Sequence, residues 1–107
     1  IGGGVAEVVG QLLQALGKHH QVLSVTHLAQ VAVHAREQLR VAKREGKQGT
    51  IASVEALEPA ARVEEIARML GGLRITEATR RHAEEMLQNA RTAGTPAKRE
   101  KGRAARA

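Results

Sequence analysis

The side chain best placed for chemistry is a histidine that follows a predicted strand. The run "VLSV" at residues 22–25 is apolar and β-branched, which is typical of a short buried strand, and a helical pattern, "HLAQVAVHA", begins at His27. In α/β proteins, ligands bind outside the carboxyl ends of such strands. His27 is therefore a candidate binding or catalytic residue, and a purely structural histidine at a strand end is the alternative.

The other histidines and an N-terminal glycine run are weaker candidates. His19 and His20 lie in the predicted turn "KHHQ" and are expected to face solvent, whereas His34 stands seven residues after His27 and could share a helix face with it. No Cys or Asp is present to complete a zinc ligand set, so we expect no metal site. The glycines at residues 2–4 could form an anion-binding nest, but the residues alone favour a flexible loop.

Several catalytic classes are excluded by what the 107 residues lack. The chain has no GxxxxGKS/T phosphate loop and no G-x-S-x-G nucleophile elbow, so it carries no complete catalytic set. The absence of Cys fits a reducing cytosol, and no apolar run approaches the length of a membrane span. The chain opens with "IGGG" and no Met, from which we expect that its beginning is missing.

Positive charge is concentrated near the C-terminus. The formal net charge is +6, and residues 91–107 hold six Lys/Arg against one Glu, which leaves +1 for residues 1–90. The segment "TAGTPAKREKGRAARA" has no periodic apolar residues and is expected to be disordered. We therefore predict a folded unit over residues 1–90 and a disordered basic tail over residues 91–107. Such a tail would bind nucleic acid weakly and without sequence preference.

The elements that must position these residues follow from the apolar pattern. A stripe at helical spacing predicts a first helix from Val5 to Leu16, ended by Gly17 as a left-handed glycine would end it. After the "VLSV" strand and its helix, "EQLRVAKRE" and "TIASVEAL" read as two strands of a hairpin joined by "GKQG". The order predicts an α/β fold with few strands and flanking helices. Without Phe, Tyr or Trp, we expect so small a unit to be weakly stable alone.

Two further helices are predicted after the hairpin. Pro59 suits a first helical position, and the pair Gly71-Gly72 suits the end of that helix. Thr76 can cap a last helix that runs to about Asn89. The apolar faces of these two helices are expected to consist of Val63, Ile66, Ala67 and Leu70, and of Ala83, Met86, Leu87 and Ala90.

These segments in combination resemble a known family. "IGGGVAEVVGQLLQALGKHHQVLSVTHLAQVA", followed at the right distance by "RVEEIARMLGG" and "TEATRRHAEEML", is similar to the C-terminal end of the RecN family of bacterial DNA-repair ATPases, which are related to the SMC and ABC proteins. The resemblance covers residues 1 to about 90, and "VTHLAQVA" with "EEIARMLGG" is its most specific part. It implies that the chain is the C-terminal lobe of a P-loop NTPase head.

The resemblance also implies site residues, cofactors and partners. His27 would be the switch histidine that reaches the γ-phosphate of ATP, and Gly2, Gly3 and Gly4 would form the D-loop against a second head in a nucleotide-sandwich homodimer. Ala29 departs from the Pro that is usual after "THL", which could loosen that turn. The phosphate loop, Q-loop, coiled-coil arms, signature motif and Walker B carboxylates would lie upstream. The chain alone should therefore be inactive, whereas the intact protein would bind ATP with Mg²⁺.

The function implied is recombinational repair of DNA double-strand breaks in the cytoplasm, at the nucleoid, with DNA as a non-specifically bound partner and no membrane. The alternative is a small non-catalytic module that binds DNA through its basic tail or that binds another protein. The absence of aromatic residues and of a recognisable reading helix argues against sequence-specific DNA recognition.

Overall fold

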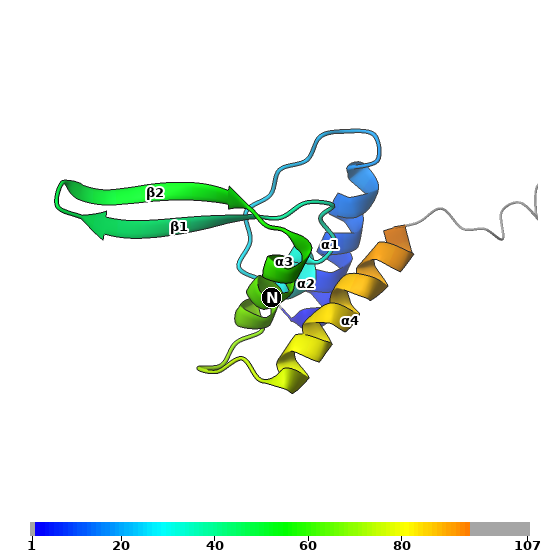
Figure 1. The fold of residues 1–107 in the computed structure, drawn as a ribbon. Coiled ribbons are helices and arrows are strands. Elements are labelled where there is room, and N and C mark those ends of the chain that lie inside the picture. Colours follow the sequence, from blue (N-terminus) through cyan, green and yellow to red (C-terminus); the bar gives the residue numbers. More distant parts are fainter. Residues whose placement is uncertain (1, 95–107) are drawn as a thin grey trace, which may run out of the picture.

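A computed structural model describes residues 2–94. The elements occur in the order α1 (Gly3–Leu16), α2 (Ala29–Ala32), β1 (Leu39–Gly46), β2 (Gly49–Ala56), α3 (Pro59–Met69) and α4 (Glu77–Gly94). The four helices gather into one body, and the two strands form an arm that projects from it (Figure 1). No helix in residues 2–94 is long and apolar enough to cross a membrane.

The hairpin is confirmed as predicted. Strands β1 and β2 pair antiparallel, with Leu39 opposite Ala56 at the base and Gly46 opposite Gly49 at the tip. Gly49 has a φ of 111°, a backbone conformation that glycine adopts without steric penalty. The arm lies outside the helical body, and every residue of it except Ala42 is exposed.

The core lies between α2, α3 and α4. Its buried side chains are mostly alanine, and Ile66 is the one large side chain that is fully buried among the described residues. Alanine allows helices to approach closely, which compensates in part for the missing aromatic residues. The predicted inner faces of the last two helices are confirmed. The buried cluster comprises Ala29, Ala32, Val33, Ile66, Ala67, Ala83, Leu87 and Ala90, with Val63, Leu70 and Met86 packed against it.

Of the four predicted ends of α3 and α4, three are confirmed. Pro59 occupies the start of α3, and Gly71 and Gly72 follow its end with φ values of 104° and 99°. The hydroxyl of Thr76 accepts a hydrogen bond of 3.1 Å from the Thr79 amide and caps α4. The fourth end was wrong: α4 continues to Gly94, so the boundary at residue 91 falls inside a helix. The rest of the predicted tail, residues 95–107, lies outside the described residues.

The first helix is confirmed, and much of its predicted apolar stripe is exposed. Ala6 and Gly10 are its buried residues, whereas Val5 and Leu12 on the predicted apolar stripe are 57% and 65% exposed. Gly17 ends the helix with a φ of −65°, in the right-handed region, so the helix does not need glycine there. Periodicity identified the helix, but the surface that would cover its stripe is not among the described residues.

The predicted strand at residues 22–25 is not formed. The segment is extended, yet it pairs with no other segment in residues 2–94, because the sheet there consists of β1 and β2 alone. Leu23 and Val25 are 82% and 97% exposed. A strand needs a hydrogen-bonded neighbour as well as a β-branched sequence, and this segment has the sequence without the neighbour.

Candidate functional site

His27 lies at a bend between the extended segment and α2. The hydroxyl of Thr26 accepts a hydrogen bond of 3.0 Å from the Leu28 amide, which closes a small turn around the histidine. The imidazole is exposed and forms no hydrogen bond or ion pair with the described residues. Its ring nitrogens are therefore open to a ligand that approaches from solvent.

The backbone beyond His27 is held firmly. The Leu28 carbonyl accepts hydrogen bonds of 3.1 Å from the amides of Val31 and Ala32, which makes Leu28 the N-cap of α2. Ala29, Val31 and Ala32 are buried in that short helix. Ala29, which stands where Pro is expected, is 2% exposed. His27 is thus anchored on its C-terminal side and joined to an unpaired segment on the other.

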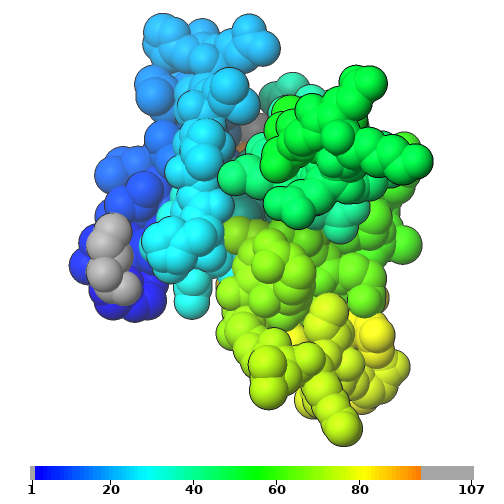
Figure 2. Space-filling view, turned by 90° about the vertical axis from the view of Figure 1, so that its left-hand side faces the viewer, coloured from blue at the N-terminus to red at the C-terminus, as the bar shows by residue number. Residues whose placement is uncertain are grey.

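An apolar groove runs beside this segment. It has a volume of about 170 Å³ and lies between α1 and the residues that lead to His27, which are neighbours in the space-filling view (Figure 2). Its walls are formed by Ala6, Val9, Leu13, Ser24, Val25, Thr26, Leu28 and Val31. The groove therefore offers an apolar surface next to the histidine, and it has few polar groups that could orient a charged ligand.

The glycine run occupies the start of α1. Gly2 is the N-cap of the helix and Gly3 and Gly4 belong to its first turn, so these residues begin a helix rather than form a separate loop. A Cβ atom added at any of the three would meet nothing within 4 Å. The structure joins none of them to His27 by a hydrogen bond, and none of them lines the groove.

A buried histidine was missed by reasoning from the sequence. His34 is 4% exposed, and its Nε2 lies 2.9 Å from Glu7 Oε2 while its Nδ1 lies 3.2 Å from Gln14 Oε1. Gln14 Nε2 donates to the Ala90 carbonyl at 2.9 Å, which directs Oε1 of the same amide toward His34. His34 therefore ties the turn after α2 to α1 and, through Gln14, to α4.

The close approach of α1 to His34 depends on Gly10. A Cβ at this position would collide with the His34 ring and lie 2.9 Å from the Gln30 carbonyl oxygen. His34 and His27 therefore do not share a face toward a common ligand: one is exposed at a bend, and the other is enclosed between helices. In residues 2–94, no three His, Cys, Asp or Glu side chains are grouped so as to hold a metal ion.

Arg62 closes the end of α2 and was also missed. Its guanidinium donates to the carbonyls of Ala35 at 2.7 Å and Ala32 at 3.1 Å, and to the Gln38 side chain at 3.0 Å. Burial lowers the pKa of Arg62, and the charge of Arg91 lowers it further. An arginine keeps its proton despite such a shift, so Arg62 is a structural cation that satisfies helix-end carbonyls.

Comparison with known proteins places the chain in a family. It is 48% identical over 88 residues to the DNA repair protein RecN of Xylella fastidiosa, and 47% identical over 87 residues to that of Vibrio cholerae. It is 44% identical over 91 residues to RecN of Streptomyces coelicolor. This chain belongs to the RecN family. No protein-family profile matches it.

The RecN likeness covers most of this chain and a small part of each relative. The matches span 81% to 85% of the chain but 16% of the length of these relatives, in their C-terminal part. The RecN segment described here includes His27, the extended segment, the hairpin arm and the helical body. The activity, substrates and partners of a whole RecN protein are therefore proposals for this chain.

Proposed function

We propose that this RecN-family chain is the C-terminal lobe of an ATP-binding and ATP-hydrolysing head, in a protein that acts in recombinational repair of DNA double-strand breaks. The observation that carries the proposal is its 44% to 48% identity to proteins named DNA repair protein RecN over more than four-fifths of its length. Such a protein would act in the cytoplasm, at the nucleoid.

In this proposal His27 donates a hydrogen bond to the γ-phosphate of ATP. Its exposed ring and the turn formed by Thr26 and Leu28 support this role, because the side chain is presented at a defined place with both nitrogens open. Phosphoryl transfer to water depends mostly on positioning and on stabilisation of charge. A donor whose contact strengthens in the transition state raises the rate of hydrolysis more than the affinity for ATP.

The glycines at residues 2–4 would form the D-loop, which contacts a second head in a nucleotide-sandwich homodimer. The open space around all three supports this, since another backbone could approach there without meeting a side chain. Their position at the start of α1 would set the direction of the helix relative to the partner.

Most of the nucleotide site would belong to the rest of the protein. Residues 2–94 offer no acidic cluster for Mg²⁺, so the phosphate loop and the metal-binding carboxylates of the proposed head would come from elsewhere in it. ATP with Mg²⁺ supplies the phosphoryl group that is transferred. The contributions proposed for this chain are the hydrogen bond from His27 and the contact made by the glycines.

Exposed apolar surface supports the idea that this lobe packs against more protein. Val5 and Leu12 on the stripe of α1 and Leu23 and Val25 on the unpaired segment are each more than half exposed, and Val25 also lines the groove. Large exposed apolar surfaces mark interaction sites in soluble proteins. The unpaired segment at residues 22–25 would gain its missing strand neighbours from the remainder of the head.

A chimera tests the proposal directly. The matching 87 residues of the Vibrio cholerae relative are replaced by the corresponding residues of this chain, and steady-state ATP hydrolysis is measured with and without duplex DNA. We expect Mg²⁺-dependent hydrolysis comparable to that of the unmodified relative, and none from a form that lacks the segment. A chimera that folds and binds ATP but hydrolyses none would contradict the proposed role.

A further inference from the structure

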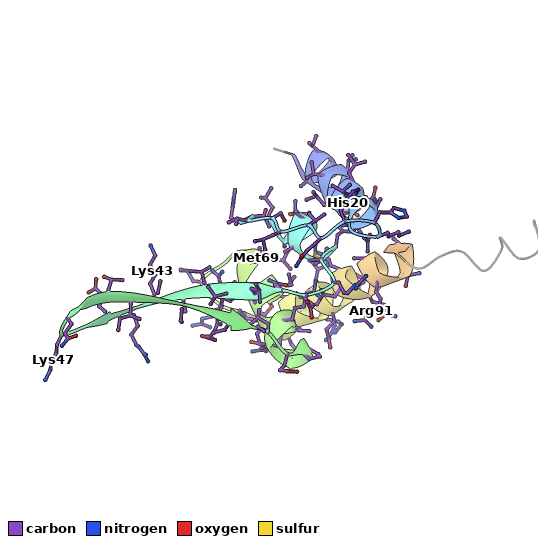
Figure 3. The ribbon with its side chains drawn as sticks, turned by 90° about the horizontal axis from the view of Figure 1, so that it is seen from above. His20, Lys43, Lys47, Met69 and Arg91 are labelled. Carbon is purple, nitrogen blue, oxygen red and sulfur yellow. The ribbon has the colours of Figure 1, made fainter. Side chains whose placement is uncertain are left out.

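The two groups proposed for the nucleotide site stand at the starts of neighbouring helices. The glycines at residues 2–4 form the N-cap and the first turn of α1, and His27 directly precedes Leu28, the N-cap of α2. Seen from above, α2 lies beside α1, while the hairpin extends away from both (Figure 3). The contacts that fix α1 against α2 therefore also fix the glycines relative to His27.

Side chains two turns apart on α1 converge on one residue after α2. Glu7 Oε2 lies 2.9 Å from His34 Nε2, and Gln14 Oε1 lies 3.2 Å from Nδ1 of the same ring. Between them, Gly10 leaves room for the ring, since a Cβ atom there would collide with it. His34 is 4% exposed and Gly10 is also buried. The contacts around the imidazole are therefore internal to this chain.

Backbone hydrogen bonds connect His34 to the turn that holds His27. The His34 amide donates to the Val31 carbonyl at 3.1 Å, and the Val31 amide donates to the Leu28 carbonyl at 3.1 Å. The Leu28 amide in turn donates to the Thr26 hydroxyl at 3.0 Å. Because α2 is a single turn, this series joins the two histidines without an intervening loop. A displacement of His34 therefore displaces His27.

Glu7 is the partner of His34 that lies nearest the glycines. It stands about one turn after Gly3 on α1. The amide of the preceding residue, Ala6, donates to the Gly2 carbonyl at 3.1 Å. A helix is stiff over this distance, since each turn is hydrogen-bonded to the next. A second head that contacts the glycines therefore acts on the same rigid element that Glu7 joins to His34.

We propose that the contact between Glu7 and His34 positions His27 for ATP hydrolysis. It holds His27 at a fixed place relative to the glycines, so that docking of a second head on the glycines and alignment of His27 with the γ-phosphate occur together. The roles of His27 and of the glycines rest on the proposed function, whereas the connection between them rests on the contacts of this chain. Glu7 and His34 act through His27, so they are positioning residues.

The first measurement follows this connection in the full 107-residue chain without nucleotide. Amide hydrogen exchange is measured by NMR in the wild type and in Glu7→Ala, Glu7→Gln and Glu84→Ala. Glu84 is an exposed carboxylate of α4 that lies outside the network, so it is the matched control. We expect Glu7→Ala to speed exchange at the Leu28 and Val31 amides by about tenfold. The Leu70 amide at the end of α3 should change by less than about twofold, because the loosening is local.

The conservative change Glu7→Gln should preserve the exchange rates of the wild type. Its amide group reaches the same place and can donate to the imidazole or accept from it. Glu84→Ala should also exchange like the wild type, because it removes a carboxylate without touching His34.

The second measurement follows hydrolysis in the chimera with the Vibrio cholerae relative. We expect Glu7→Ala to lower kcat by about tenfold with KM changed by less than about twofold, because a misplaced catalytic donor costs rate rather than ground-state binding. Glu7→Gln should recover most of kcat. In a chimera that already carries His27→Ala, Glu7→Ala should lower hydrolysis by less than about a further twofold, since the residue through which it acts is gone.

Equal acceleration of exchange at Leu70 and Leu28 would show a general loss of stability and overturn the proposal. Losses of hydrolysis from Glu7→Ala and His27→Ala that multiply would overturn it as well, and so would a Glu7→Ala variant that behaves like Glu84→Ala. If His27→Ala alone leaves hydrolysis unchanged, the proposed function of His27 fails, and the positioning role fails with it. Because exchange is measured without ATP, failure of the connection and failure of the proposed function are told apart.

Discussion

His34 and Glu7, 27 residues apart in the chain, form a hydrogen bond of 2.9 Å between Nε2 and Oε2, which joins the turn after α2 to α1. The imidazole is almost wholly buried, whereas the Glu7 side chain is 45% exposed. Removal of the histidine therefore empties a site between helices and leaves Gln14 without its partner. Removal of the glutamate leaves Nε2 of a buried imidazole without its partner.

We expect His34→Ala to lower the free energy of unfolding by about 2–3 kcal/mol, from the two lost hydrogen bonds and the cavity that remains. His82→Ala is the matched control. His82 is 58% exposed and lies 3.9 Å from Glu85, a surface pair whose loss should change stability by less than about 0.5 kcal/mol. Urea denaturation of the three proteins measures the difference. Equal midpoints for His34→Ala and His82→Ala would show that the buried network adds nothing.

Gly10→Ala should destabilise the chain although alanine favours helix formation. The added methyl group would meet the His34 ring and the Gln30 carbonyl, and overpacking of this kind costs about 1–3 kcal/mol, which exceeds the gain of about 1 kcal/mol in helix propensity. Gly4→Ala lies in the same helix with nothing within 4 Å of the new atom and should be neutral or stabilising. Thermal melts followed by circular dichroism should show a lower midpoint for Gly10→Ala and an equal or higher midpoint for Gly4→Ala. A stabilising Gly10→Ala would mean that α1 and His34 are farther apart than described.

His27→Ala in the chimera should leave ATP binding largely in place and reduce hydrolysis by about a hundredfold or more, as is typical when one well-placed donor to developing charge is lost. Equilibrium titration of nucleotide and steady-state hydrolysis with DNA present measure the two effects. His82→Ala serves as the control for turnover. His34→Ala is unsuitable, because His34 is part of the fold. If His27→Ala turns over like the unmodified chimera, His27 is only a residue at a bend.

The isolated chain should melt at low temperature or self-associate, and it should be stabilised when the remainder of a RecN head is supplied. Its core contains one fully buried large side chain among the described residues, and the groove and the stripe on α1 remain uncovered. Analytical ultracentrifugation and thermal melts test this. A sharp, cooperative melt of a monomer would favour the alternative function, an independent non-catalytic module.

Removal of residues 95–107 should weaken DNA binding without disturbing the helices. These residues contain five Lys/Arg against one Glu. The cut belongs after Gly94 rather than after Ala90, because α4 continues to Gly94 and the Ala90 carbonyl accepts a hydrogen bond from Gln14. Helical content and the salt dependence of DNA binding are the measurements. An unchanged salt slope would assign all of the binding to the described part of the chain.

Local signals predicted much of this fold. The turn around Gly49, the proline that starts α3, the glycines after it and the Thr76 cap each depend on a few neighbouring residues, and each was predicted from the sequence. The features that were missed depend on distant residues. His34 is buried because Gly10 and Gln14 come close to it, and residues 22–25 stay unpaired because no strand of the described chain lies beside them. The apolar periodicity around His34 and within residues 22–25 does not reveal which distant residues lie beside them.

At His27 too, one feature could be predicted from neighbouring residues and another could not. Its place just before a short helix could be predicted from "VTHLAQVA", and its exposure at a turn closed by Thr26 could not. The predicted grouping with His34 failed for a physical reason: the α2 segment is a single turn, so the two histidines do not share one continuous helix. The hairpin arm was predicted as secondary structure, but its projection from the body depends on how the helices pack.

The high alanine content of the core affects how precisely the relative positions of the helices are specified. Five of its eight buried residues are Ala29, Ala32, Ala67, Ala83 and Ala90, which differ little from one another in shape. Small side chains of one shape interlock little, so apolar contact alone discriminates weakly between alignments. The Glu7–His34–Gln14–Ala90 chain is directional, and its bonds are satisfied together in one alignment. We therefore expect variants that break this polar chain to populate several interconverting packings, visible as broadened methyl resonances even where helical content is unchanged.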